Sequence, residues 1–257
     1  MSPDERERYA RHIMLKEIGG PGQQRLKAAT VALVGAGGLG APAALYLAAA
    51  GVGRLRIIDD DSVSLSNLQR QVLFRTEDVG AAKTERAATA LGALNPHVEI
   101  EALPERLTAA NVRGFVENAD LVLDGCDNFE TRFLVNETCH ALGVPLISGA
   151  VGRWDGQVAT FKSGLSKHLP PEQRLPCYRC LVPEMPSNAE RCAEVGIVGA
   201  LPGVIGSMMV LEAVKEIAQA GESLAGRLFI YDGLSAAART IALKRDPACP
   251  VCGDARS

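Results

Sequence analysis

The chain has 257 residues, of which 47% are apolar, 22% charged and 4% aromatic, and its formal net charge is −3. This length allows one large α/β domain with a substantial core, and the weak charge gives no reason to expect nucleic acid or an anionic membrane surface as a partner. The N-terminal segment MSPDERERYARH is too charged for a signal peptide, so we expect a cytoplasmic protein.

The N-terminal part of the chain predicts alternating helices and strands. The expected elements are a charged helix at 3–18, a Gly/Pro loop at 20–25, a strand at 30–34, a helix at 39–50 and a strand at 55–58. No charged residue occurs from Ala28 to Gly53, which is long enough for a membrane span. Six glycines and Pro42 interrupt this stretch, however, and favour a strand, a turn and an alanine-rich helix.

The rest of the chain continues the alternation and changes character after Gly149. Helices are expected at 81–94, 129–142 and 204–219, strands at 97–102, 120–123, 144–148, 157–162, 227–231 and 238–243, and a Pro-rich loop at 163–189. The apolar stripe of the helix at 204–219 is predicted to consist of Val204, Met208, Leu211 and Ile217. The sequence therefore predicts an α/β fold: a Rossmann-like, mostly parallel sheet with helices on both faces, extended by C-terminal antiparallel strands.

A glycine-rich turn, GAGGLG at 35–40, follows a predicted strand and opens a predicted helix. Glycines in this context form a tight turn and let phosphate oxygens approach the backbone N–H groups at the helix N-terminus. Asp59 lies 19 residues after Gly40, at the end of the second strand, where a carboxylate can accept both ribose hydroxyls. These features predict a nucleotide site without specifying which nucleotide binds.

Four further polar residues fall in loops or at helix starts that follow strands. They are Asn67, Arg70, Lys83 and Asp127. Ligands of a parallel sheet bind at the carboxyl ends of its strands, so these side chains could converge on one crevice. Taken singly, Arg70 and Lys83 could equally be solvated surface charges, and Asp127 could be a turn residue or a helix cap. Together they favour a triphosphate over the dinucleotide of a dehydrogenase.

Six motifs in combination resemble the MoeB/ThiF/HesA family, whose members are relatives of the ubiquitin-activating enzymes. The motifs are GAGGLG (35–40), DDDSVSLSNLQRQ (59–71), GAAKTER (80–86), DGCDNFETR (124–132), CYRC (177–180) and GVIGSMMVLEAVK (203–215). The resemblance covers nearly the whole chain and is closest to the molybdopterin-synthase type. It implies ATP·Mg²⁺-dependent adenylation of the C-terminal Gly-Gly carboxylate of a small ubiquitin-like sulfur carrier.

The resemblance also implies a role for each matching residue. Gly38 would lie at the phosphate turn, Asp59 would bind ribose, Asn67, Arg70 and Lys83 would address the phosphates, and Asp127 would hold Mg²⁺. Arg11, in a helix with the family's R-Y-x-R pattern, would reach the phosphates of a neighbouring subunit, so a homodimer is expected. Without the resemblance, Arg11 would be interpreted as a surface charge on an amphipathic helix.

The implied chemistry fits this set of charges. A C-terminal carboxylate has a pKa of about 3.5, so at neutral pH it is already an anionic nucleophile and needs no general base. The difficulty is to bring it to the α-phosphate of another anion and to stabilise the departing pyrophosphate. Arg11, Arg70, Lys83 and a metal ion on Asp127 would supply positioning and neutralise charge.

Two cysteine pairs, Cys177/Cys180 and Cys249/Cys252, provide four thiolates suited to a tetrahedral structural Zn²⁺. The 68 residues between the pairs mean that such a site would clasp the C-terminal tail to the Pro-rich loop. Disulfides are the alternative, which a cytoplasmic location disfavours. Cys192 matches the position where some members of the family carry a reactive cysteine, whereas others adenylate without one.

We expect a single domain over 1–257, with a nucleotide-binding half at 1–150 and a carrier-binding half at 151–257 that includes the crossover loop and the zinc site. The chain ends five residues after Cys252, so no C-terminal rhodanese domain is expected and a separate protein would supply sulfur. Activation of the thiamine-thiazole carrier is the near alternative. An NAD-dependent oxidoreductase and a non-catalytic binding module are alternatives from other classes.

Overall fold

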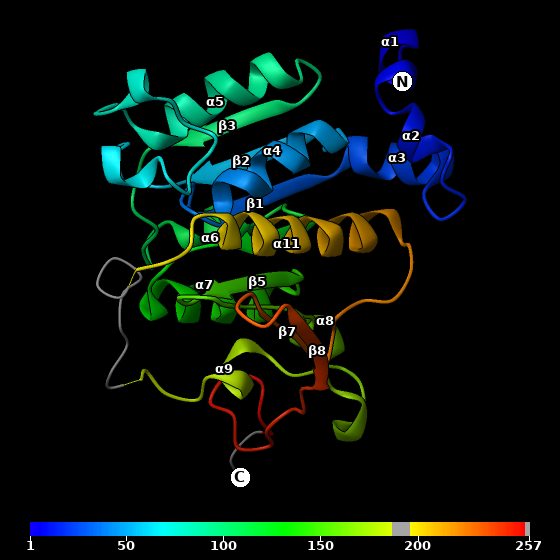
Figure 1. Ribbon diagram of the computed structural model, residues 1–257. Helices are drawn as coiled ribbons and strands as arrows, with labels where there is room; N and C mark the ends of the chain where they lie inside the picture. Colours follow the sequence, from blue (N-terminus) through cyan, green and yellow to red (C-terminus); the bar gives the residue numbers. More distant parts are fainter. Residues whose placement is uncertain (187–195, 255–257) are drawn as a thin grey trace.

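The structure is a computed structural model that describes residues 1–186 and 196–254 (Figure 1). Its centre is an eight-stranded sheet in the order β3-β2-β1-β4-β5-β6-β7-β8. The strands are β1 (Thr30–Val34), β2 (Arg54–Ile58), β3 (Glu99–Leu103), β4 (Leu121–Asp124), β5 (Leu146–Val151), β6 (Asp155–Phe161), β7 (Arg227–Asp232) and β8 (Ala237–Ala242). Strands β1 to β5 pair in parallel, and β6, β7 and β8 extend the sheet in antiparallel fashion. This confirms the predicted fold class.

Helices cover both faces of the sheet (Figure 1). Those on one face are α3 (Gly19–Ala28), α4 (Gly40–Ala50), α5 (Lys83–Leu94) and α11 (Ala200–Ala218), and those on the other are α6 (Val112–Val116) and α7 (Phe129–Leu142). A hydrophobic core lies between the sheet and the helices on each face, and strand β1 contributes to both. Val31 and Leu33 pack on the face of α4 and α11, whereas Ala32 and Val34 pack on the face of α6 and α7. This alternation follows from the two-residue period of a strand and makes β1 a central, fully covered strand.

The uncharged stretch at 28–53 forms β1, a glycine turn and α4, as predicted from its glycines. Helix α4 is short, with 11 residues, and ends at Gly51, which adopts the left-handed conformation. Among the described residues, no helix is long and apolar enough to cross a membrane.

The N-terminal segment differs from the prediction in two ways. The helix expected at 3–18 is interrupted at Tyr9 and forms α1 (Pro3–Arg8) and α2 (Ala10–Ile13), because the Tyr9 ring is buried and its hydroxyl accepts a hydrogen bond from Asn95 Nδ2 at 2.8 Å. The loop expected at 20–25 is instead part of α3. Pro21 lies in the first turn of α3, where a missing N–H removes no hydrogen bond from the helix, so the Gly/Pro signal was misleading.

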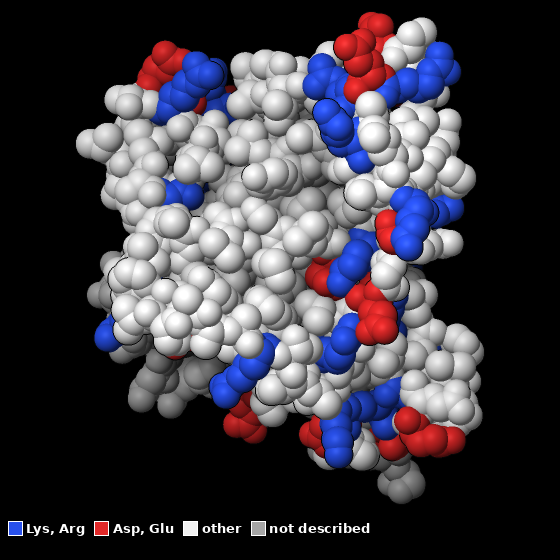
Figure 2. All heavy atoms as spheres, turned by 45° about the vertical axis from the view of Figure 1, so that its right-hand side comes forward, with Lys and Arg blue, Asp and Glu red and all other residues white. Residues whose placement is uncertain are grey.

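Helix α11 also differs from its prediction, because it begins at Ala200 and faces the core with another stripe. Pro202 lies in its first turn. The core side chains are Leu201, Ile205 and Met209, whereas Val204 and Leu211 are 42% and 58% exposed. Of the predicted stripe, Met208 and Ile217 pack against the core, whereas the prediction was wrong for Val204 and Leu211. Figure 2 shows a broad surface without charged side chains over this side of the molecule, where α4 and α11 lie side by side.

The segment expected to be a loop at 163–189 contains short helices. They are α8 (Ser163–Ser166), the 3₁₀ turn η3 (Pro171–Gln173) and α9 (Tyr178–Leu181). Helix α9 packs on α7, where the Tyr178 N–H donates a hydrogen bond to Asn136 Oδ1 at 2.8 Å. Such four-residue helices depend on tertiary contacts rather than on their own propensity, which is why sequence patterns missed them.

Candidate functional site

The glycine turn joins β1 to α4 in a conformation that only glycine fits at two positions. Gly35 has a φ of +86°. A Cβ on Gly40 would lie 1.8 Å from the carbonyl oxygen of Gly35, which a folded backbone does not tolerate. A Cβ on Gly38 would meet only side chains, Pro202 at 3.4 Å and Arg70 at 3.7 Å. The turn thus places the first-turn N–H groups of α4 at the carboxyl end of β1, where an anion can bind.

Asp59 and Lys83 lie together beside this turn. Asp59 Oδ2 accepts a hydrogen bond from the Ala36 N–H at 2.7 Å, and Oδ1 accepts one from the Asp61 N–H at 2.8 Å. Lys83 Nζ is 2.6 Å from Asp61 Oδ2 and 4.0 Å from Asp59 Oδ1, although the lysine is almost fully buried. Burial raises the pKa of Asp59 despite the nearby Lys83 charge. Asp59 therefore supports the glycine turn, a contact that the sequence did not indicate.

Asn67 and Arg70 approach the turn from the polar segment that follows β2. Asn67 ends the 3₁₀ turn η1 (Leu65–Asn67), and its Oδ1 accepts a weak hydrogen bond from the Ser64 N–H at 3.4 Å. Arg70 donates to the Ser66 carbonyl at 3.1 Å, and its Cδ lies 3.7 Å from the place that a Gly38 Cβ would occupy. The aliphatic part of the Arg70 side chain therefore lies beside the glycine turn.

Gln71 is a residue of this site that the sequence reasoning missed. It is only 4% exposed, and its Nε2 would lie 3.7 Å from a Cβ on Gly37. Within the described part of the chain, its Oε1 has no hydrogen-bond partner. Its place directly after Arg70 was the only available signal, because burial beside a turn is not visible in a single sequence.

Asp127 lies in the loop between β4 and α7, and this loop passes the glycine turn. A Cβ on Gly125 would lie 3.2 Å from the backbone N of Gly40. The cap of α7 is Asn128, whose side chain accepts from the Thr131 N–H at 2.9 Å. Asp127 is exposed and is not the helix cap, so its carboxylate remains available to a ligand. This removes the alternative in which Asp127 only caps the helix.

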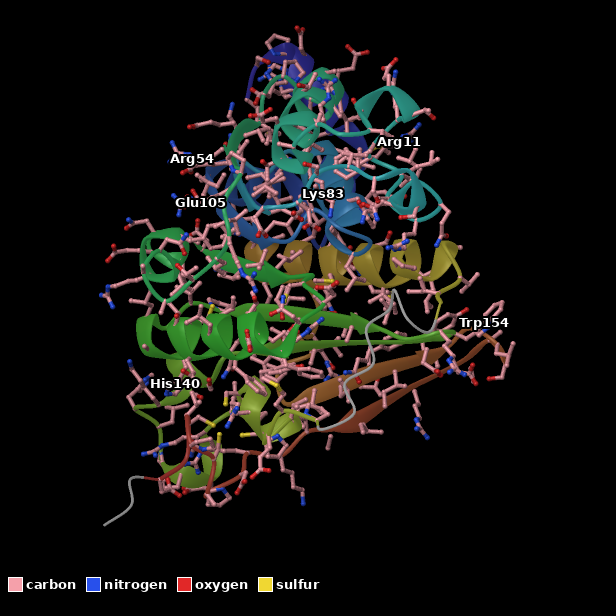
Figure 3. The ribbon with its side chains drawn as sticks, turned by 90° about the vertical axis from the view of Figure 1, so that its left-hand side faces the viewer. Arg11, Arg54, Lys83, Glu105, His140 and Trp154 are labelled. Atoms are coloured by element: carbon pink, nitrogen blue, oxygen red, sulfur yellow. The ribbon has the colours of Figure 1, made fainter. Side chains whose placement is uncertain are left out.

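Of the predicted nucleotide-site residues that the structure describes, Arg11 lies away from the glycine turn. It is exposed on α2, next to Tyr9, which packs against Gly51 at the C-terminal end of α4. The glycine turn is at the other end of α4, about 16 Å away for 11 residues at 1.5 Å each. Helix α2 accordingly lies beside α3 at the right of Figure 1, where β1 begins. Figure 3 labels Arg11 and Lys83 on their separate elements.

The two cysteine pairs converge as predicted. Cys177 Sγ is 3.5 Å from Cys249 Sγ, and Cys180 Sγ is 3.3 Å from Cys252 Sγ. These distances are too long for a disulfide, whose S–S bond is about 2.05 Å. They approach the separation of about 3.8 Å between ligands of a tetrahedral zinc with Zn–S bonds of about 2.3 Å. The four sulfurs lie within 4.8 Å of one another, so this cluster can bind a metal ion.

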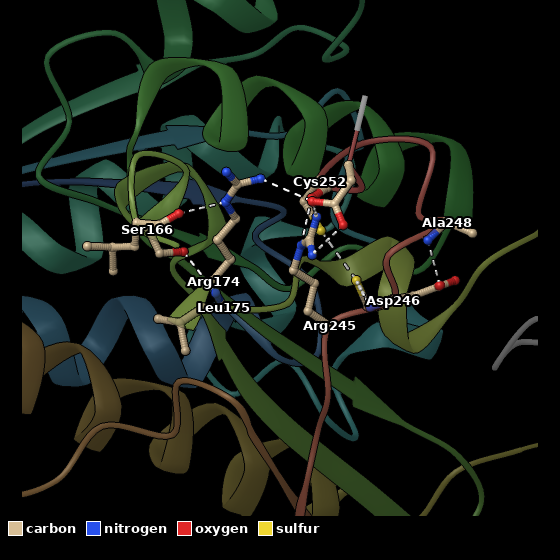
Figure 4. Close-up of polar contacts among 10 residues, drawn as sticks. Ser166, Arg174, Leu175, Arg245, Asp246, Ala248 and Cys252 are labelled. Carbon is tan, nitrogen blue, oxygen red and sulfur yellow. Dashed lines mark hydrogen bonds and ion pairs between the residues drawn. The ribbon is translucent and has the colours of Figure 1, made fainter. Parts of the chain in front are cut away.

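Polar contacts hold the polypeptide around the cysteine cluster (Figure 4). The Asp246 N–H donates to Cys180 Sγ at 3.4 Å, and Arg245 Nε donates to the Cys252 carbonyl at 2.9 Å. Asp254 pairs with Arg245 at 2.6 Å and with Arg174 at 3.2 Å. Hydrogen bonding with Cys180 and Cys252 raises the pKa of the Cys177 thiol, because the four thiols lie close together.

The other cysteines have simpler surroundings. Cys139 is buried and burial raises its pKa, as expected for a structural thiol. Cys126 is half-buried, and desolvation together with the neighbouring Asp124 raises its pKa well above the ordinary value. Cys192, the candidate reactive cysteine, lies outside the described residues.

The site combines two cations, an open helix N-terminus and two carboxylates at one edge of a parallel sheet. Lys83 and Arg70 with the glycine turn can bind a polyphosphate, and Asp127 is a carboxylate of the kind that Mg²⁺ prefers. The arrangement therefore suits the transfer of a group from a bound nucleotide by positioning and charge neutralisation.

The sequence is similar to that of known proteins over nearly its whole length. The model of the ThiF family matches residues 9–251. A sulfur carrier protein adenylyltransferase of Thermus thermophilus is 49% identical, over 98% of this chain and 92% of the relative. A sulfur carrier protein ThiS adenylyltransferase of Escherichia coli is 44% identical, over 96% of this chain and 94% of the relative. A probable adenylyltransferase/sulfurtransferase MoeZ of Mycobacterium tuberculosis is 42% identical, over 97% of this chain and 63% of the relative.

Solved structures show the same fold. The chain of E. coli MccB in the structure with ATP has a TM-score of 0.79 at 23% identity, covering 96% of this chain and 73% of that one. PaaA has a TM-score of 0.76 at 26% identity, covering 95% of this chain and 75% of that one.

Proposed function

The chain belongs to the ThiF family, and on this basis we propose that it adenylates a small ubiquitin-like sulfur-carrier protein at the C-terminal Gly-Gly carboxylate, using ATP. The observation that carries the proposal is the placement of Lys83, Arg70 and Asp127 around a glycine turn, in a chain whose relatives are named sulfur carrier protein adenylyltransferases. An oxidoreductase of similar fold would need none of these three side chains.

In the proposed reaction, a carboxylate oxygen of the carrier attacks the α-phosphorus of ATP. A new O–P bond forms, the bond from the α-phosphorus to the bridging oxygen breaks, and pyrophosphate leaves. The glycine turn at Gly38 would bind phosphate oxygens, and Asp59 would hold the ribose. Asn67, Arg70 and Lys83 would bind the phosphates, so that the anionic nucleophile can approach and the leaving group is neutralised.

Mg²⁺ fits the same site. Asp127 is exposed and is not used as a cap, and a carboxylate oxygen is a ligand that Mg²⁺ prefers. When bound, the ion would neutralise part of the phosphate charge. Orientation of the phosphates remains the task of Lys83 and Arg70.

We further propose a homodimer in which Arg11 acts on the neighbouring subunit. Arg11 lies about one α4 length from the glycine turn of its own chain, so a site that uses this cation is incomplete without a second copy. The uncharged surface over α4 and α11 (Figure 2) is a suitable interface. Tyr46 and Leu211 on this surface are each 58% exposed, and exposed apolar surface of this extent favours association.

We assign nucleotide binding to 1–150 and carrier binding to 151–257, within a single domain. In the second half, Trp154 (Figure 3) is 43% exposed and Leu234 is 74% exposed. They are close in space, because the Gly233 N–H donates to the Trp154 carbonyl at 2.8 Å. Strand β8 is exposed along its whole length at the edge of the sheet. An edge strand flanked by apolar side chains can bind a folded partner protein.

For the carrier we propose the one that serves molybdopterin synthesis, with the thiamine-thiazole carrier as the alternative. The relatives' names include both MoeZ and the ThiS adenylyltransferase. A separate protein would supply sulfur to the acyl-adenylate, and we place the reaction in the cytoplasm. Pyrophosphate exchange against a panel of Gly-Gly-terminated carriers identifies the substrate as the carrier that supports exchange.

The role of Asp127 gives the direct test. Asp127→Ala should lower carrier-dependent ATP–pyrophosphate exchange by at least about 100-fold, because it removes the carboxylate that holds Mg²⁺. Its melting temperature should stay within about 2 °C of the wild type, because the side chain is exposed. Glu130→Ala is the matched control, since it removes an exposed carboxylate from the first turn of α7. Near-normal exchange by the Asp127 variant would contradict the assignment.

A further inference from the structure

A buried arginine fixes the backbone of the loop that carries Asp127. Arg132, on α7, is 6% exposed, and its Nη2 donates hydrogen bonds to the carbonyl of Cys126 and, at 2.9 Å, to that of Gly149. Cys126 is the residue immediately before Asp127. The guanidinium therefore joins the loop after β4 to β5, the neighbouring strand.

The other terminal nitrogen of Arg132 completes this network. Nη1 donates to Ser148 Oγ at 2.8 Å and to Asp124 Oδ2 at 3.2 Å. Asp124 in turn accepts from the Ser148 hydroxyl at 3.0 Å and, through Oδ1, from the Cys126 N–H at 3.1 Å. Burial alone would lower the pKa of Arg132, but the Asp124 carboxylate raises it, so the side chain stays charged. Both the N–H and the carbonyl of Cys126 are thus fixed by one ion pair.

The same guanidinium connects to the cysteine cluster. It lies over the ring of Tyr178, 5.9 Å from the ring centre. Tyr178 stands between Cys177 and Cys180, and its ring also packs against Phe161 at 5.8 Å and Phe133 at 6.0 Å. The segment 177–180, which supplies two thiols of the cluster, therefore contacts Arg132 directly through Tyr178.

We propose that Arg132 and Tyr178 are positioning residues that fix the Asp127 loop in the geometry required for Mg²⁺ binding. This inference rests on the proposed function, because it concerns the role assigned to Asp127. Neither residue would touch the nucleotide or the carrier. Their effect would be exerted through the backbone of Cys126, and groups that orient a metal ligand in this way commonly change metal affinity by tenfold or more.

Arg132→Lys provides the first test. Lysine keeps the charge, but its single ammonium group lacks the planar fork that lets arginine contact two carbonyls and a carboxylate at once. The Mg²⁺ concentration for half-maximal pyrophosphate exchange should rise roughly tenfold. Exchange at saturating Mg²⁺ should recover most of the wild-type rate, which loss of a catalytic group or general unfolding would not permit.

Arg56→Lys is the matched control. Arg56 is also largely buried, donates to the Phe115 carbonyl at 2.7 Å and pairs with Glu101 at 2.8 Å, but it holds α6 rather than the Asp127 loop. It should leave the Mg²⁺ dependence unchanged. If it raises the Mg²⁺ requirement as much as Arg132→Lys does, a specific positioning role is contradicted.

A second readout does not depend on catalysis. Amide hydrogen exchange at Cys126 should be faster in Arg132→Lys than in the wild type, whereas Leu123 inside β4 should be unchanged. If the wild-type protein shows no carrier-dependent pyrophosphate exchange, the proposed function fails. If it does, and the variant alters neither the Mg²⁺ requirement nor Cys126 exchange, only the positioning role fails.

Tyr178→Leu keeps the proposal testable if the buried arginine proves essential for folding. Leucine retains apolar bulk but removes the ring face beneath the guanidinium, so a smaller shift in the same direction is expected for both readouts. Phe161→Leu serves as its control, because it removes a ring that packs on Tyr178 at 5.8 Å, whereas the guanidinium of Arg132 lies over the ring of Tyr178 itself. Equal effects of the two substitutions would overturn the assignment of Tyr178.

Discussion

Single glycines of the fingerprint turn have separable tasks. A methyl group on Gly40 would collide with the Gly35 carbonyl oxygen at 1.8 Å, whereas one on Gly38 would make ordinary contacts with Pro202 at 3.4 Å and Arg70 at 3.7 Å. Gly40 is therefore required by the fold itself. Gly38 is free of such a requirement, so its lack of a side chain serves what binds at the helix N-terminus.

Substitution by alanine should separate these tasks. Gly40→Ala is expected to destabilise the protein by about 2 kcal/mol or more, because the turn must shift to remove the clash. Gly38→Ala should unfold at the wild-type temperature but bind ATP at least about tenfold more weakly, since its methyl occupies the approach of phosphate oxygens. Thermal unfolding and calorimetric titration with ATP measure the two effects. Wild-type affinity in Gly38→Ala would contradict the placement of the phosphates.

At this scale, residue type and order in the chain predicted part of the site and missed another part. Asp59 and Lys83 were predicted to lie at the same edge of the sheet because each follows a strand. In the structure, Lys83 Nζ is 4.0 Å from Asp59 Oδ1. The support that Arg132 gives to the loop after β4 and the burial of Gln71 were not predicted. Both depend on which neighbour a side chain meets across the sheet, and periodicity in one sequence does not contain that information.

Elements with a continuous pattern and clear end signals were predicted closely. Helix α7 spans Phe129–Leu142 and β1 spans Thr30–Val34, as expected. Helix α3 was missed because proline in a first turn resembles a loop. The stripe on α11 was wrong for Val204 and Leu211, because this helix is apolar on most sides and the pattern alone does not identify which side faces the sheet.

The four-cysteine cluster that joins α9 to the C-terminal segment should contain zinc. We expect about one zinc per chain by elemental analysis of purified protein, because four thiolates at these separations match a tetrahedral structural site. Cys249→Ser should lose most of this metal and unfold at a lower temperature. Cys139→Ser is the control, since Cys139 is buried outside the cluster and should leave the zinc content unchanged. A wild-type protein with well under one zinc per chain would refute the site.

On the scale of the whole molecule, the proposed use of Arg11 would need a second chain, because Arg11 lies away from the glycine turn of its own chain. Nucleotide-facing side chains lie at the carboxyl ends of the strands, whereas α2 is anchored at the opposite end of α4 through Tyr9 and Gly51. The uncharged surface over α4 and α11 offers the area for association. The R-Y-x-R pattern already implied this arrangement by resemblance, and the chain path supplies a physical reason for it.

Mixing inactive variants tests the shared site. Arg11→Ala and Asp127→Ala chains should each be inactive, but reassorted dimers should recover about a quarter of the wild-type exchange, because half of the dimers are mixed and one of their two sites is intact. Lys83→Ala mixed with Asp127→Ala is the matched control and should recover nothing, since both residues serve their own chain's site. Equal recovery in the two mixtures, or none in either despite verified subunit exchange, would rule out the trans role of Arg11.

The four-cysteine cluster also has a consequence for folding during synthesis of the chain. Cys177 and Cys249 are 72 residues apart, and the ribosome needs roughly 4 to 14 seconds to synthesise a segment of that length. During this interval the first thiol pair has been synthesised without the second pair, so α9 is not yet joined to the C-terminal segment. The nucleotide-binding strands, by contrast, all precede Cys177 and can pair beforehand. Metal capture would then be a late step of biogenesis, so zinc scarcity in the cell should yield chains whose sheet has formed but whose Asp127 loop has not been tightened.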